Sequence, residues 1–136
     1  MAAAIYIVVE GDDPGYDIFV HGRALARHED ALGHLAGQLR VRPLLDFFSA
    51  DVNAMALLAE REAGMEEWGD CVPRPQWFSP ADGLETVRAL IGFLADHPAA
   101  LGSETRPVQL ELAEFEQVLS KTLLRSLRWH LAVSFL

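Results

Sequence analysis

Cysteine is nearly absent from this sequence: the chain of 136 residues contains one, Cys71. A single cysteine forms no disulfide within the chain and supplies no cluster of thiolates for a metal ion. The N-terminal stretch has no lysine or arginine before Arg23 and no long apolar run, which is unlike a secretion signal or a membrane-spanning helix. We therefore expect a reducing, cytoplasmic location.

Positive charge is scarce as well. The chain has 11 lysine and arginine residues against 20 aspartate and glutamate residues, which gives a net charge of -9. Nucleic acids and anionic membranes are bound by clustered lysine and arginine, so this balance argues against both as partners. The charge is compatible with a basic protein partner, with cations, or with solubility alone.

The motifs of common enzyme and metal sites are missing. The sequence has no H-E-x-x-H zinc motif, no glycine-rich phosphate loop after a strand and no G-x-S-x-G nucleophile motif. Asp30 and His34 lie four residues apart on a predicted helix, but a metal site needs three or four ligands. We therefore predict no metal ion, no cofactor and no catalytic residue.

Four short segments have the composition or the alternation of β-strands. Residues 4–10 are apolar on both faces, residues 16–20 follow a turn signal, GDDPG, and residues 107–112 begin as a strand. Residues 129–135 alternate, with large apolar side chains at the odd positions and His130, Ala132 and Ser134 between them, which predicts a half-buried strand. We expect the first and last of these strands to be neighbours in one sheet.

Four other segments have the period of an amphipathic helix, and they begin near residues 29, 51, 80 and 111. The third is the best defined, because Ser79 is a favourable N-cap, Pro80 suits the first helical position and Asp82 completes a capping box. The predicted order is ββαααβαβ. This irregular order is typical of an α+β protein. We predict a single domain over residues 1–136, with a small, mostly antiparallel sheet of about four strands and about four helices packed mainly on one face.

Acidic residues are concentrated near the end of the second predicted helix. Residues 60–70 contain five carboxylates and one base, Arg61. The C-terminal end of a helix is negative, so an unpaired carboxylate there costs about 0.3–1 kcal/mol. Glu62 and Glu66 also repel each other across one helical turn. If this helix end is fully solvated, the cost is small and the acids need no function. The alternative is that the chain accepts the cost because the acids bind a partner.

The predicted binding residues are Glu62, Glu66, Glu67, Trp68 and Asp70. An aromatic ring flanked by carboxylates suits an arginine of a partner, through cation–π and ion-pair contacts. The first hypothesis is therefore a non-enzymatic, cytoplasmic binding protein that recognises a basic protein through an acidic surface around residues 60–70.

Two other functions remain open. The first is a small enzyme in which Cys71 is the nucleophile, which requires a base such as His21 or His130 beside it in a deep pocket. The second is a structural domain that associates with itself, for example as a homodimer.

Several segments resemble small uncharacterised bacterial α+β proteins of about this length. They are YDIFVHGRALA, PLLDFFS, EEW, WFSPADGLETVRAL and the closing RWHLAVSF. This resemblance implies a structural likeness and no known activity. In size, charge and class the chain is also similar to the small acidic immunity proteins that neutralise bacterial toxins, although it shares no motif with them.

Overall fold

The computed structural model describes residues 3–11, 15, 20–49 and 76–135. In this part the protein is of the mixed α+β class, as the sequence predicts. Its elements are β1 (Ala3–Val9), α1 (Arg23–Arg27), α2 (Glu29–Leu39), the 3-10 helix η1 (Leu44–Phe47), α4 (Pro80–Asp96), the 3-10 helix η3 (Gly102–Glu104), α5 (Thr105–Leu124) and β2 (Trp129–Phe135).

The two strands confirm the prediction that the ends of the sequence meet in one sheet. β1 and β2 are antiparallel, with Ile5 opposite Val133 and Ile7 opposite Leu131. Ile5, Ile7 and Leu131 are almost fully buried and belong to the hydrophobic core. Burial of this shared apolar face is what brings together two segments so far apart in the sequence.

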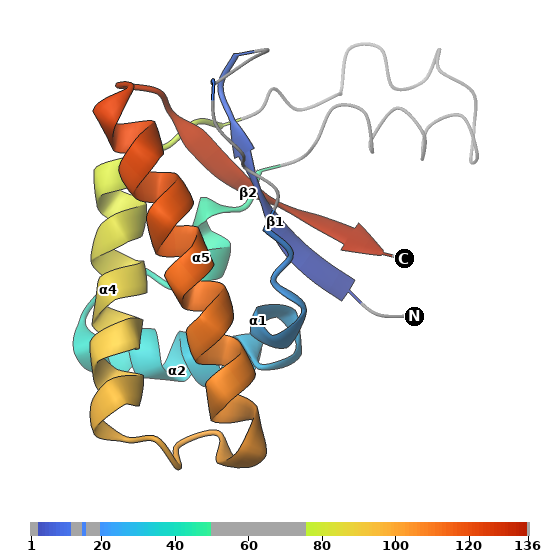
Figure 1. Ribbon diagram of the computed structural model, residues 1–136, viewed down its shortest axis with the longest axis vertical. Coiled ribbons are helices and arrows are strands. Elements are labelled where there is room, and N and C mark those ends of the chain that lie inside the picture. The colour runs from blue at the N-terminus through green and yellow to red at the C-terminus, as the bar shows by residue number, and fades with distance from the viewer. Residues whose placement is uncertain (1–2, 12–14, 16–19, 50–75, 136) are drawn as a thin grey trace.

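The helices form a layer to one side of the strands (Figure 1). α4 and α5 lie side by side along most of their length, and α2 crosses near one end of the pair. Leu90 and Leu94 of α4 and Leu112 and Phe115 of α5 are fully buried between these elements. Their helical spacing places them on one face of each helix, so the amphipathic pattern decides which faces pack.

α4 begins where the sequence predicts. Ser79 has an extended backbone, and its side-chain oxygen accepts a hydrogen bond from the Ala81 amide at 3.2 Å. Pro80 occupies the first helical position, where its missing N–H costs nothing. The helix ends at Asp96, so both of its limits agree with the prediction.

Residues 107–112 are helical, and the predicted strand there is wrong. They lie in the first turns of α5, in which Pro107 is tolerated. The alternation of Val108, Leu110 and Leu112 suggested one strand face. In the helix Val108 and Leu112 share the buried face, whereas Leu110 is 53% exposed. Packing of α5 on α4 favours the helix, because Val108 and Leu112, four residues apart, then lie on the same buried face, and Leu110 is left in solvent.

The sheet of the described residues has two strands rather than the predicted four, so the order ββαααβαβ is not what these residues form. One of the other two predicted strands is helical, as shown above. The other, at residues 16–20, lies outside the described residues except for Val20, which is not in a strand. The helix predicted to begin near residue 51 also lies outside them.

Residues 129–132 of β2 are buried on both faces, whereas the strand was expected to be half-buried. His130 is 3% exposed and Ala132 is 1% exposed, although both lie on the face opposite Trp129 and Leu131. The ring of Trp77 packs against the His130 ring, with 4.7 Å between their centroids. A polar residue in an alternating strand therefore does not mark a solvent face when an aromatic side chain covers it.

A carboxylate from α5 fixes the start of α1. Glu111 accepts hydrogen bonds from the amides of Ala24 and Leu25, at 3.0 and 2.9 Å. These amides belong to the first turn of α1, where no neighbouring side chain serves as a cap. Glu111 satisfies donors that the helix itself leaves free, and it ties α1 to α5.

Candidate functional site

The predicted binding residues Glu62, Glu66, Glu67, Trp68 and Asp70 lie outside the described residues, and so does Cys71. Their role stays a prediction. The structure does describe the two places where the chain leaves for this acidic segment and returns from it.

These two places are joined at the outer edge of β2. The Ser49 amide donates to the Leu131 carbonyl at 3.0 Å, and Phe78 exchanges two backbone hydrogen bonds with Trp129. The two ends also contact each other, because the Gln76 amide donates to the Ser49 side-chain oxygen at 2.7 Å. Ser49 and Gln76, which flank residues 50–75 in the sequence, thus lie together at this edge of the sheet.

Aromatic side chains hold this point to the core. Phe47 stacks on Trp129 at 5.0 Å between ring centroids and meets the edge of Phe78 at 5.4 Å. The Arg42 guanidinium lies over both phenylalanine rings, 4.7 Å and 5.3 Å from their centroids. Such contacts are stabilising beyond the area they bury, so the residues around Phe47 and Phe78 are firmly packed.

The two histidines proposed as bases differ sharply in their surroundings. His21 is exposed. His130 is buried, and its Nδ1 lies 3.1 Å from the Leu131 carbonyl oxygen. Since Cys71 lies outside the described residues, the hypothesis of a cysteine enzyme stays a prediction.

Glu10 and Arg128 form a bidentate ion pair next to the sheet. Arg128 Nε donates to one carboxylate oxygen of Glu10 at 3.1 Å, and a terminal nitrogen donates to the other. These hydrogen bonds from Arg128, together with the attraction of its charge, lower the pKa of Glu10. A carboxyl whose pKa is lowered by folding contributes stability above its unfolded pKa, and that contribution is lost as the pH falls through the folded pKa.

We therefore expect the Glu10 carboxyl to titrate below the ordinary glutamate value of about 4.3, and Arg128→Met to return it to that value. An NMR titration of the side-chain carboxyl in both proteins measures this. Arg88→Met is the matched control, because Arg88 pairs with Glu116 at 3.7 Å and should leave Glu10 unchanged. An identical Glu10 titration in wild type and Arg128→Met would show that the pair does not form in solution.

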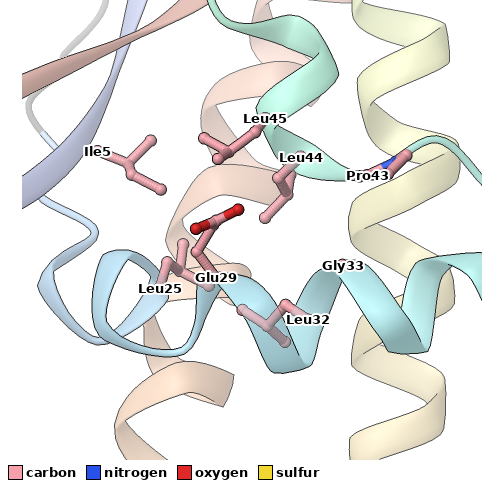
Figure 2. A pocket seen from close by; sticks show the side chains of 8 residues that line it. All are labelled: Ile5, Leu25, Glu29, Leu32, Gly33, Pro43, Leu44 and Leu45. Carbon is pink, nitrogen blue, oxygen red and sulfur yellow. The ribbon is translucent and has the colours of Figure 1, made fainter.

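A hollow lies between β1, α1, α2 and the segment that leads into η1, as Figure 2 shows. The hollow is shallow, with a cavity volume of about 20 Å³. Small-molecule sites usually measure about 300–1,000 Å³, so this hollow is far too small to enclose a substrate or cofactor of ordinary size. Its lining is Ile5, Leu25, Glu29, Leu32, Gly33, Pro43, Leu44 and Leu45.

Glu29 is the charged residue of this lining. Its side chain extends among Leu25, Leu44 and Leu45, with the carboxylate turned toward the middle of the hollow (Figure 2). It is half-buried, and within the described part of the chain it has no ion pair and no hydrogen-bond partner for its carboxylate.

Sequence reasoning missed Glu29 as a site residue. In the sequence it is an acid at the start of a helix, where the helix dipole favours a negative charge. The hollow exists only because α1, α2, η1 and β1 meet, and no local pattern reports that meeting. The one available signal was that Leu32 lies three residues after Glu29, and so next to it on the surface of the predicted helix.

No three histidine, cysteine, aspartate or glutamate residues in the described part of the chain are grouped so as to hold a metal ion. The helices of this part are too short or too polar to cross a membrane. Comparison with models of known families, with curated proteins and with solved structures gave no match. The resemblance to small bacterial proteins therefore stays a prediction.

Proposed function

We propose that this protein is a non-enzymatic, cytoplasmic binding protein that recognises a basic protein partner through the acidic residues around positions 60–70. The charge of the chain carries the proposal: a net charge of -9, with five carboxylates and a single arginine in residues 60–70. Complementary charge steers a partner toward its site and raises the association rate.

Two observations on the described residues support this function. Arg27, Arg88 and Arg128 each pair with a glutamate, namely Glu104, Glu116 and Glu10, so these arginines are already engaged within the fold. In addition, Ser49 and Gln76, which flank residues 50–75, are hydrogen-bonded to each other beside the packed core. A partner that binds residues 60–70 would therefore not need to disturb the core, because the flanking residues are fixed to it.

We expect Glu62→Gln combined with Glu66→Gln to weaken binding to a basic partner, mainly through a slower association rate and with strong salt dependence. The same variant should be slightly more stable if the predicted helix forms there, because it removes like-charge repulsion across one turn of that helix, worth about 0.2–0.5 kcal/mol. The partner is obtained by capture from lysate of the source organism, and its association rate is measured at several salt concentrations.

The matched control is Glu85→Gln combined with Glu114→Gln. Both glutamates are exposed on α4 and α5, and this variant loses the same charge at a different place. Its association rate with the partner should stay close to that of the unchanged protein. Equal losses in the two variants would mean that the total charge acts rather than residues 60–70. A clearly destabilised Glu62/Glu66 variant would mean that these carboxylates hold the fold, and the proposed function would be wrong.

A further inference from the structure

The orientation of Glu29 is not explained by its place in the helix. Glu29 is the first residue of α2, and the positive end of the helix favours a carboxylate there. That effect does not require the side chain to point into an apolar hollow. A carboxylate among leucines loses hydration, and this loss is offset when a cation or a hydrogen-bond donor joins it. The described residues supply neither to Glu29.

We propose that Glu29 pairs with one arginine side chain of a basic partner protein, which lies across the open mouth of the hollow between α1, α2 and η1. The guanidinium would pair with the Glu29 carboxylate, and the aliphatic stem would pack on Leu25, Leu44 and Leu45. The site thus joins a single negative charge to apolar walls, which matches a side chain with an apolar stem and a cationic end.

Arginine fits this hollow better than lysine. A guanidinium is more weakly hydrated than an ammonium, so it loses less on entering an apolar site. Its planar fork also donates two parallel hydrogen bonds to one carboxylate. Arginine is one of the residues that most often dominate the energy of a protein interface, where it fills a pocket near the centre.

This inference rests on the proposed function, because the arginine comes from the same basic partner. The two sites have different kinetic signatures. Exposed acids outside a pocket act mainly on the association rate, whereas a charge pair inside a pocket acts mainly on the dissociation rate. Glu29→Gln should therefore accelerate dissociation of the captured partner, and the Glu62/Glu66 variant should slow association.

The direct test uses n-butylguanidinium as a probe and needs no partner. The full chain is labelled with ¹³C at its isoleucine and leucine methyl groups, and the methyl chemical shifts are followed by NMR. We expect saturable shifts at Ile5, Leu25, Leu32, Leu44 and Leu45. n-Butylurea, which is neutral and of the same shape, should bind about fivefold more weakly, the upper end of what a partly exposed ion pair contributes.

Two variants make the result specific. Glu29→Gln should lower the affinity for n-butylguanidinium by about fivefold and leave the affinity for n-butylurea unchanged. Gly33→Leu should abolish the shifts of both probes, since Gly33 lines the hollow and an added Cβ meets no atom within 4 Å. Gly92→Leu is its control, because Gly92 is an exposed helical glycine with the same free space. The methyl spectra themselves show whether each variant is folded.

Three outcomes would overturn the proposal. Shifts spread over the surface would show that the probe follows the overall charge. Equal affinities for n-butylguanidinium and n-butylurea would show that the hollow binds an apolar stem without recognising charge. Stronger binding of n-butylammonium than of n-butylguanidinium would show that the site prefers lysine to arginine. If instead the probe binds as expected and the Glu62/Glu66 variant keeps its full association rate, the function proposed for residues 60–70 fails and the arginine site stands.

Discussion

Trp129→Ala should lower the free energy of unfolding by about 3–5 kcal/mol, the range for a large aromatic residue removed from a core. Trp129 is fully buried and stacks on Phe47. Its indole N–H donates to the Ser79 carbonyl at 3.1 Å, next to the start of α4. The substitution therefore opens a cavity and also breaks a contact between β2, η1 and the N-terminus of α4.

Urea unfolding at a constant m value measures this loss. Trp129→Phe separates the cavity from the lost hydrogen bond, because it keeps an aromatic ring and removes the N–H donor. The lost hydrogen bond is worth about 0.5–1.5 kcal/mol, and the packing loss is smaller than in Trp129→Ala. Leu124→Ala is the control: Leu124 is 84% exposed and should change stability by no more than about 0.5 kcal/mol. A loss below about 1 kcal/mol in Trp129→Ala would contradict the packing described around this residue.

Gly83→Ala should destabilise the protein by about 1–3 kcal/mol, the usual range for an overfilled core. A Cβ at Gly83 would lie 2.3 Å from Cζ2 and 2.8 Å from Cε2 of Trp129. These distances are too short for carbon atoms in contact, and Trp129 is fully buried and hydrogen-bonded, so its ring has little freedom to move. The absence of a side chain at Gly83 is what lets the Trp129 indole lie so close to the α4 backbone.

Gly92→Ala is the matched control in the same helix. An added Cβ at Gly92 meets nothing within 4 Å, so the ordinary preference of a helix for alanine should raise stability by about 0.5–1 kcal/mol. The two substitutions are chemically identical and should have opposite signs in urea unfolding. A stabilising Gly83→Ala would show that the indole shifts without cost.

A double-mutant cycle tests the cause. In the Trp129→Phe background the loss on Gly83→Ala should be smaller, because the indole atoms that the new Cβ would meet are no longer there. Residues in contact show coupling energies of about 0.5–3 kcal/mol in such cycles. Strictly additive effects would mean that Gly83 and Trp129 do not limit each other.

The sequence alone determined the elements whose signals are local. α4 was predicted from Ser79 and Pro80 to residue 96, since capping and the fixed backbone angle of proline act within one turn. β1 and β2 were predicted as paired strands because both are short, strongly apolar segments. The excess of acids is also read from the composition alone, and the binding function proposed for residues 60–70 rests on that excess.

Tertiary structure decided which faces of these elements are covered. Residues 107–112 alternate like a strand, yet packing on α4 selects the helical set of Val108 and Leu112. His130 looks solvent-facing in the sequence and lies under Trp77 in the fold.

The same is true of positions that depend on distant partners. Glu111 reads as a surface acid and caps α1 across 87 residues, and Glu29 lines a hollow built from β1, α1, α2 and η1. Local propensity depends on neighbours along the chain, so the sequence reports it. Burial and pairing depend on segments that meet only after folding, and the free energy of that contact overrides weak local preferences.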